Sequence, residues 1–399
     1  GTVFALLFSP VAFGSVHVWA YSLLELLVFT LVLLFFFGRF FSGRGGQIEI
    51  VRTPVDIFVL LFFAWVLFQV LPVPRWAVFA LSPETYRDKM QFLAFFDEFS
   101  RTRGIEYSPD FLAYYRHPVY LELLKIASYA GMFFLVVNTA NTGKRLNFLI
   151  HLLVFSGLFQ ALYGLFQFFG QQRGVLWLSR PRYGFASGTF IVSNHFAFYV
   201  AMAFFLALGL LVAHRKEQSD FAAGFKTPRA RLQAVVRWFS PESSNPKRMF
   251  LFLVAVMMGT ALIMSGSRGG IVSVAVALLA ISFLFLTKKR LRKIAALSLI
   301  VCMGAFASAA YTGMEKTLDK FGTIESKFEF RVCVTKDMIP ILLDYPLTGS
   351  GLGNFHCIYP RYQSPECNAL GSSMYSHCDW LEMGADTGLV GLAMVAGVA

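Results

Sequence analysis

Long runs of apolar residues, separated by shorter polar segments, are the feature that most constrains the fold of this chain. The chain is 56% hydrophobic and 15% charged, whereas soluble domains are about 45 to 50% apolar and about 25% charged. A helix of about 20 apolar residues crosses a bilayer and satisfies its own backbone hydrogen bonds inside the lipid. The sequence therefore predicts an all-α fold, a polytopic transmembrane helix bundle.

Ten apolar runs are expected to form the transmembrane helices. They cover residues 3–13, 23–37, 55–71, 119–137, 148–169, 190–213, 249–264, 271–286, 294–310 and 381 onward. The last run continues to the final residue, so we expect about twelve spans in a longer chain. Residues 1–399 are interpreted as a single transmembrane domain.

The charges between the apolar runs predict which side of the membrane each loop occupies. With the N-terminus in the cytoplasm, every loop on the cytoplasmic side is net basic, and the largest of them covers residues 214–248. The two long loops on the other side, residues 72–118 and 312–378, contain at least as many acids as Lys and Arg. This distribution follows the positive-inside rule and predicts two periplasmic loops. The net charge of +12 thus reflects topology, and no nucleic-acid partner is expected.

Four of the five cysteines lie in or beside the second periplasmic loop, at Cys333, Cys357, Cys367 and Cys378. The periplasm is oxidising, so disulfides are allowed there. Cys357 with Cys367 is the preferred bridge, because it would close a loop rich in Pro and Gly. A zinc site is the weaker alternative, since the paired CxxC spacing typical of zinc ligands is absent. No bound metal is expected.

Arg268 lies in MSGSRGG, a short connection between two apolar runs. An arginine near the bilayer interior costs about 2.5 to 3.5 kcal/mol on insertion scales, so it either reaches the interface or binds a ligand. The neighbouring glycines let the guanidinium and the backbone amides approach an anion. The connection falls on the outer face, where a cation does not help orientation, and this favours ligand binding over an interfacial arginine in a tight turn.

Further arginines are expected on the outer face. Arg180 and Arg182 stand in SRPRYGF, which leads to Asn194 and His195 in SNHFA. A guanidinium can bind two phosphate oxygens at once, so clustered arginines favour a diphosphate ligand. Arg331 begins a stretch with the pattern of a helix, in which a solvated helix face is the alternative to a ligand-binding role.

His377 is the best candidate for a general base among the seven histidines. The unperturbed pKa of a histidine is about 6.5, so its ring accepts a proton at neutral pH. Asp379 and Glu382 follow closely, and one or the other is expected to orient the ring. The alternative is a histidine at a helix start, with carboxylates that only stabilise the helix dipole.

Two other features carry weaker signals. The run GSGLGNF, residues 349–355, has the spacing of a phosphate-binding loop, but it follows Pro346 on the outer face and is interpreted as a turn that shapes a cavity. Glu122 and Lys125 stand one helical turn apart in the fourth apolar run. They either pair with each other or line a path for a transported substrate.

The segments GTFIVSNHFAFY, SGSRGG, EFRVCVTKDM, DYPLTGSGLGNFHCIYPRY and SHCDWLEMGADTGLVG occur in the order seen in a known family. From about residue 156 onward, the chain resembles the O-antigen ligase and O-antigen polymerase family of bacterial polysaccharide enzymes. The resemblance implies an inverting, metal-independent glycosyltransferase without a cofactor. It also implies the bacterial inner membrane, with the active site facing the periplasm.

The resemblance further implies the substrates and the roles of individual residues. The donor would be an undecaprenyl-diphosphate-linked glycan, and the acceptor a sugar of the lipid A core or another glycan. Arg268 and Arg331 would bind the donor diphosphate, while His377 would activate the acceptor hydroxyl. The residues expected to contact substrate are Arg180, Arg182, Asn194, His195, Asp379 and Glu382. The family commonly has Asn after the histidine, where this chain has Cys378.

Three other functions stay open at this point. A repeat-unit polymerase or a protein O-oligosaccharyltransferase of the same family would use the same donor and a different acceptor. A transporter of lipid-linked glycan would move the donor across the membrane without forming a glycosidic bond. Membrane lipid is an expected partner in every case.

Overall fold

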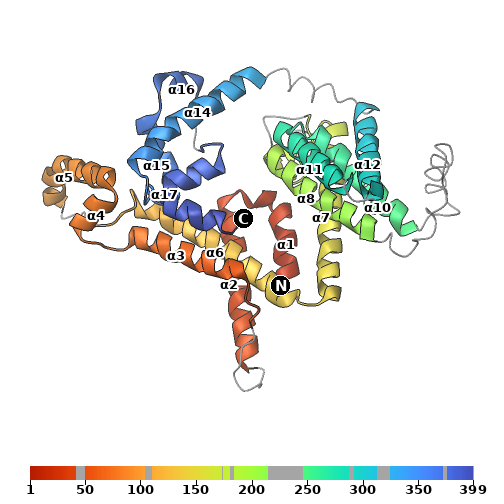
Figure 1. Cartoon of the computed structure of the whole chain (residues 1–399), viewed down its shortest axis with the longest axis horizontal. Helices are drawn as coiled ribbons and strands as arrows, with labels where there is room; N and C mark the ends of the chain where they lie inside the picture. The colour runs from red at the N-terminus through yellow and green to blue at the C-terminus, as the bar shows by residue number, and fades with distance from the viewer. Residues whose placement is uncertain are drawn as a thin grey trace. The chain divides into compact units, whose positions relative to one another are not determined.

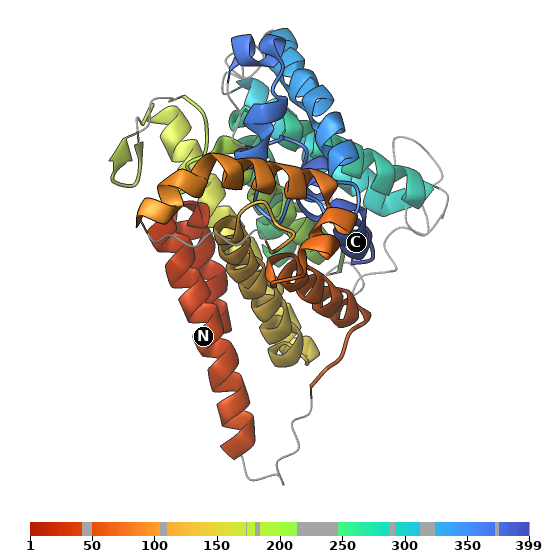
Figure 2. The same ribbon diagram turned by 90° about the vertical axis from the view of Figure 1, so that its left-hand side faces the viewer.

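The computed structural model describes residues 1–41, 50–103, 110–172, 174–179, 184–213, 246–286, 292–311, 324–371 and 375–398. Most of these residues are helical (Figures 1 and 2). The elements are α1 (Thr2–Val11), η1 (Phe13–Ser15), α2 (Val18–Phe41), α3 (Pro54–Val70), α4 (Arg75–Leu81), α5 (Pro83–Arg103), α6 (Arg116–Thr139), α7 (Gly143–Phe169), β1 (Gly174–Val175), β2 (Leu178–Ser179), α8 (Ser193–Ala213), α10 (Pro246–Met264), α11 (Arg268–Leu286), α12 (Arg292–Tyr311), α14 (Ile324–Asp344), α15 (Phe355–Tyr362), α16 (Pro365–Leu370) and α17 (Asp379–Ala396). Apart from the short antiparallel pair β1–β2, the expected all-helical fold is confirmed.

The ten expected apolar runs all overlap helices, namely α1, α2, α3, α6, α7, α8, α10, α11, α12 and α17. Within the described part of the chain, five of these helices, α2, α6, α7, α8 and α10, are long and apolar enough to cross a membrane. Shorter apolar helices are α1, α3 and parts of α11 and α12. By length and composition the chain is a multi-pass membrane protein, and ten stays the predicted number of spans.

The chain divides into two compact units, which are described separately. The first unit consists of Gly1–Leu27 and Thr139–Gly322, and the second of Val28–Asn138 and Thr323–Ala399. The expected single transmembrane domain therefore contains two units, each with its own apolar core. Of the basic loop expected at residues 214–248, residues 214–245 lie outside the described residues.

In the first unit, α8 packs against α7, α10 and α11 (Figure 1). Small residues allow these helices to approach closely, as is common between transmembrane helices. A Cβ atom added to Gly157 of α7 would lie 2.2 Å from the Cβ atom of Ala203 of α8. A Cβ atom on Gly259 of α10 would lie 2.6 Å from that of Ala305 of α12. Larger side chains at these glycines would push the helices apart.

In the second unit, α17 packs against α3 and α14, and α14 also packs against α15 and α16. The two long loops between apolar runs thus contain helices: α4 and α5 in residues 72–118, and α14, α15 and α16 in residues 312–378. The helix expected from the pattern that begins near Arg331 is confirmed as part of α14. The side of the membrane on which the two loops lie stays a prediction.

An ion pair and a hydrogen bond join α5 to the second long loop. Asp88 of α5 forms an ion pair with Arg361 of α15 and accepts a hydrogen bond from the hydroxyl of Tyr345, 3.3 Å away. The neighbouring Lys89 is buried, and its Nζ donates to the carbonyl oxygens of Phe111 and Ala113 at 2.5 and 2.8 Å. Burial and the charge of nearby Arg116 lower the pKa of Lys89 to about 6. Within the second unit, α5 is therefore bonded to Tyr345 and to Arg361 of α15.

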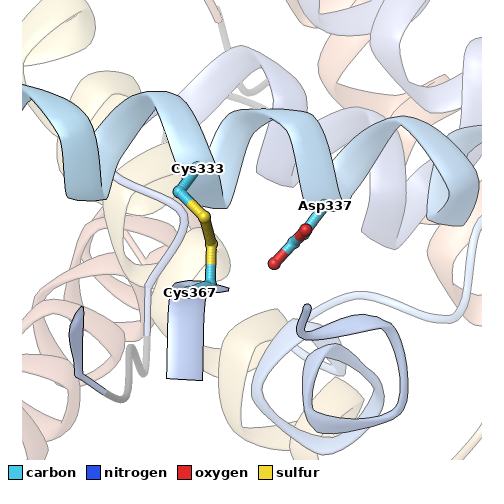
Figure 3. A group of neighbouring side chains, drawn as sticks. All are labelled: Cys333, Asp337 and Cys367. Carbon is cyan, nitrogen blue, oxygen red and sulfur yellow. A yellow bond between two sulfur atoms is a disulfide. The ribbon is translucent and has the colours of Figure 1, made fainter. Parts of the chain in front are cut away.

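The disulfide joins Cys333 to Cys367, so the preferred bridge between Cys357 and Cys367 was wrong (Figure 3). The reason is packing, because α16 lies against α14 and buries Cys367 there, while Cys357 is a free thiol on α15. Asp337 stands one turn beyond Cys333 and accepts hydrogen bonds from Ser364 N at 3.0 Å and Ser364 Oγ at 3.2 Å. Although these two cysteines and Asp337 have the spacing of metal ligands, both sulfurs are used in the disulfide.

Candidate functional site

His377 lies in the segment that leads into α17, and its side chain is exposed. Its backbone has φ +60°, a left-handed conformation that is uncommon for residues other than glycine and is found where surrounding contacts enforce it. The imidazole lies edge-on to the ring of Phe330 of α14, with 6.2 Å between the ring centroids. Residues far apart in the sequence therefore meet around the candidate base.

Glu382 holds the backbone beside His377. Its Oε2 accepts hydrogen bonds from Ser376 N and from Ser376 Oγ, both at 2.8 Å. Ser376 Oγ also accepts a hydrogen bond from Cys378 N at 3.0 Å, so the three residues around the base form one small network. The carboxylate therefore holds the loop. Within the described part of the chain, no hydrogen bond joins Glu382 or Asp379 to the His377 ring.

Arg331 of α14 acts electrostatically on the His377 ring. Although His377 is exposed, neighbouring residues remove part of the water around its ring. This desolvation and the positive charge of Arg331 lower the pKa of His377 from its usual value, while the negative charge of Glu382 opposes the shift. A lowered pKa means that the ring is neutral at pH 7, which is the form that accepts a proton. Because Phe330, the residue before Arg331, contacts the His377 ring, two of the three expected catalytic residues lie on segments that meet, and Glu382 holds the backbone beside His377.

Arg268 belongs to the first unit, whereas Arg331 and His377 belong to the second. It is the first residue of α11, and Ser267 caps this helix by accepting a hydrogen bond from Gly270 N at 3.2 Å. A Cβ atom on Gly270 would lie 2.8 Å from the Cβ atom of Ala197 of α8, so the glycine lets the first turns of α8 and α11 meet. Free amides and the helix dipole favour an anion at such helix starts.

The remaining expected substrate-binding residues fall into three groups. Asn194 and His195 are exposed in the first turn of α8, in the same unit as Arg268. Asp379 is exposed in the first turn of α17. The cluster of Arg180 and Arg182 lies outside the described residues.

Sequence reasoning missed two of the three residues that shape the site, and it left the third, Asp386 in SHCDWLEMGADTGLVG, without a role. Phe330 packs on the His377 ring, Ser376 joins Glu382 to the base segment, and Asp386 is buried where the glycine-rich run meets α17. Ser376 stands six residues before Glu382, whereas the two residues of a capping box are three apart, so the sequence did not indicate that these two residues bond. For Asp386 the available signal was an acid inside an apolar run, which marks a functional or structural site.

Comparison with protein families gives one match. Residues 253–396 match the model of the family described as O-antigen ligase, and this region includes Arg268, Arg331 and His377. No curated protein and no solved structure matches the chain. The resemblance to the O-antigen ligase family that the motifs predicted is therefore confirmed, over the region that contains all three expected catalytic residues.

Proposed function

We propose that this protein transfers a glycan from an undecaprenyl-diphosphate-linked donor to a hydroxyl of a lipid A core sugar on the periplasmic face of the bacterial inner membrane. The family match supports a membrane glycosyltransferase of the O-antigen ligase and polymerase type. The observation that carries the proposal is the contact between α14 and the segment before α17: Phe330, next to Arg331, lies edge-on to the His377 ring at 6.2 Å between centroids. Partial desolvation and the charge of Arg331 lower the pKa of His377, so the ring is neutral at pH 7.

The reaction needs a base and a stabilised leaving group. In the proposed step a ring nitrogen of His377 takes the proton of the acceptor hydroxyl as the oxygen forms a bond to the anomeric carbon of the donor. The bond from that carbon to the diphosphate breaks, and the lipid diphosphate leaves with the electron pair. Attack from the face opposite the leaving group inverts the anomeric configuration.

Arginines suit the second task. The departing diphosphate gains negative charge, and a guanidinium stabilises developing charge on phosphate oxygens through two hydrogen bonds at once. We assign this role to Arg331 and to Arg268, whose position at the start of α11 adds the helix dipole. Asn194, His195, Asp379 and Glu382, with Arg180 and Arg182, are proposed to contribute to substrate binding. The chemistry assigned to these residues requires neither a metal nor a cofactor.

Two observations support the periplasmic side. The loop that includes α14, α15 and α16 contains a disulfide between Cys333 and Cys367. Disulfides persist in the periplasm and are rare in the cytosol. The balance of acids and cations in residues 312–378 also fits an outer loop under the positive-inside rule.

Purified protein in lipid nanodiscs, mixed with undecaprenyl-diphosphate-linked glycan, tests the proposal. Parallel reactions contain lipid A core, additional donor, or an acceptor peptide, and mass spectrometry identifies the product. The proposal predicts glycan on the lipid A core, with the same yield after treatment with a chelator. Extended glycan on the donor lipid would indicate a polymerase, and glycosylated peptide would indicate a protein glycosyltransferase.

A separate arm tests transport. Liposomes that contain the protein and a fluorescent lipid-linked glycan report movement of the donor between leaflets. Donor movement without any new glycosidic bond would contradict the proposal and support a transporter. Glu122 and Lys125 give no support to transport, since Lys125 Nζ donates a hydrogen bond to Glu122 and the two charges form an ion pair.

A further inference from the structure

The loop that follows α14 is bonded to the middle of α17. Ser350 N donates to the carbonyl oxygen of Ala385 at 2.8 Å, and Gly351 N donates to that of Asp386 at 2.8 Å. Leu389 N donates in return to the carbonyl oxygen of Pro346 at 2.8 Å. We call residues 346–354 together with residues 385–389 the α17 clamp.

The clamp replaces hydrogen bonds that α17 lacks. The helix is broken at Gly388, where φ is +67° and ψ is −175°. In an unbroken helix, the carbonyl of Ala385 would accept from the amide of Leu389. Here each of these two groups bonds to the loop instead. Buried backbone groups need such partners, so the loop stabilises the break.

Glycines are required where the loop and the helix touch. A Cβ atom on Gly349 would lie 2.3 Å from the carbonyl carbon of Asp386, and one on Gly388 would lie 2.1 Å from the carbonyl oxygen of Leu347. Gly349, Gly351 and Gly353 also have φ of +65°, +101° and +76°. The run that resembled a phosphate-binding loop in spacing therefore binds protein backbone.

Asp386 contributes its side chain as well as its carbonyl. The residue is only 4% exposed, and its Oδ2 accepts a hydrogen bond from Gly353 N at 2.6 Å. Gln69 of α3 completes the arrangement, because its Nε2 donates to Thr348 O at 2.6 Å and its Oε1 accepts from Leu352 N at 3.3 Å. The Asp386 side chain thus bonds to the loop after α14, and its backbone carbonyl also accepts a hydrogen bond from Gln69 of α3 at 3.3 Å.

The clamp connects the two helices that hold the candidate base. One side continues directly from α14, which carries Arg331 and Phe330. The other side is α17, whose first turn contains Glu382, the residue that holds Ser376 beside His377. A shift between α14 and α17 would therefore move Arg331 relative to His377.

We propose that Asp386 is a positioning residue for glycan transfer, because its buried carboxylate fixes α17 against the loop after α14 and so sets the placement of His377 beside Arg331. This inference rests on the proposed function. Asp386 acts through the clamp and does not touch the substrate. It is distinct from Asp379 and Glu382, which stand on the first turn of the same helix.

The test compares three variants of the full chain in nanodiscs. Asp386→Ala removes the oxygen that accepts from Gly353, whereas Asp386→Asn keeps an oxygen at that position. Glu366→Ala is the control, since it removes an exposed carboxylate from α16 in the same unit. Thermal unfolding and size-exclusion chromatography establish that each variant is inserted and folded.

Two readouts are taken for each variant. The first is kcat and KM for glycan transfer, and the second is modification of His377 by diethyl pyrocarbonate as a function of pH, followed by peptide mass spectrometry. Arg331 on α14 and Glu382 on α17 are the charged groups that act on this ring. The modification needs no substrate, so it reports the effect of the clamp on His377 even if the wild-type protein transfers no glycan. Absence of transfer by the wild type would overturn only the proposed function.

For Asp386→Ala we expect kcat to fall about 100-fold, the scale of a misplaced catalytic group, with little change in KM. The pH of half-modification of His377 should rise as Arg331 moves away. Asp386→Asn should restore both readouts, and Glu366→Ala should match wild type. Wild-type kcat in Asp386→Ala, or loss of kcat without a change in the His377 profile, would overturn the proposal. If Asp386→Ala does not insert into the membrane, a folded Asp386→Asn variant whose kcat is about 100-fold lower than that of the wild type would contradict the proposal.

Discussion

Arg268 and His377 are both expected to act on the same reaction, yet the chain holds them by different means. Arg268 begins a regular helix, capped by the neighbouring Ser267. His377 stands in a loop with a left-handed backbone, and its surroundings come from Phe330 of α14 and Glu382 of α17. The position of Arg268 depends on its neighbours in the sequence. The position of His377 also depends on contact with Phe330, which is tens of residues away in the sequence.

This difference indicates how each residue will respond to changes around it. A helix start that is defined by a local cap tolerates distant substitutions, because few other elements determine its conformation. A loop that depends on several elements is sensitive to any change that shifts one of them. We therefore expect distant substitutions in the second unit to change the behaviour of His377 and to leave the helix start at Arg268 intact.

Apart from His377 itself, the largest effect is expected for Arg268→Ala. Loss of one group that stabilises charge in the transition state commonly lowers kcat by about 10² to 10³. Arg268→Lys should recover only part of the rate, since an ammonium lacks the planar fork that binds two phosphate oxygens. The measurement is kcat for glycan transfer in nanodiscs, with Arg145→Ala, an exposed arginine at the start of α7, as the control. Equal rates for Arg268→Ala and the control would remove Arg268 from the mechanism.

Arg331→Gln should shift the pH dependence of transfer. Desolvation and the charge of Arg331 both lower the pKa of His377, so removal of this charge raises that pKa part of the way toward the usual value. The base acts in its neutral form, and the rate therefore falls as pH decreases through this pKa. The acid limb of kcat/KM against pH should move to higher pH in Arg331→Gln and stay in place in Arg331→Lys. An unchanged acid limb in Arg331→Gln would contradict the electrostatic coupling of the two residues.

Loss of the disulfide should destabilise the second unit. Replacing Cys333 and Cys367 by serine removes a bridge across 34 residues, and removal of a disulfide typically costs about 2 to 4 kcal/mol. Thermal unfolding should occur at a lower temperature in this double variant and in reduced wild-type protein. Cys357→Ser changes a free thiol and serves as the control. If the double variant unfolded at the wild-type temperature, α16 would not need the bridge to stay on α14.

Ser267→Ala should have the smallest effect. It removes the side-chain acceptor for Gly270 N and should lower the free energy of unfolding by about 0.5 to 2 kcal/mol, as for other helix caps. The acid limb of the pH profile should be unchanged, because the substitution leaves the Arg331–His377 pair intact. Chemical denaturation followed by circular dichroism measures the stability. A shifted acid limb would show that this cap also influences the base.

The fold was predictable wherever the signal was local. Apolar runs predicted helices because a helix satisfies its backbone within one segment, and all ten runs overlap helices. The disulfide was not predictable, since the Pro- and Gly-rich loop favoured a bridge from Cys357 to Cys367, whereas the packing of α16 on α14 places Cys333 beside Cys367. The division into two units likewise depends on packing between segments that are far apart in the chain.

The site followed the same pattern. Arg268, Arg331 and His377 were predicted from motifs, and all three lie in the region that matches the family model, while their roles stay a prediction. Glu382 was one of two acids expected to orient the His377 ring, and its carboxylate accepts hydrogen bonds from Ser376 instead. The role of GSGLGNF became visible only when its amides were seen to bond the carbonyl oxygens of α17. Spacing alone does not distinguish a loop that binds phosphate from one that binds backbone.

The central claim is that His377 is the base of a glycan transfer, and one measurement tests it most directly. Formation of the new glycosidic bond is followed for wild type, His377→Ala and His151→Ala, a control that removes an exposed histidine of α7. A general base typically contributes about 10² to 10⁴ in rate. We therefore predict a loss of this size in His377→Ala, and wild-type rates in His151→Ala. A folded His377→Ala variant that transfers glycan at the wild-type rate would contradict the account.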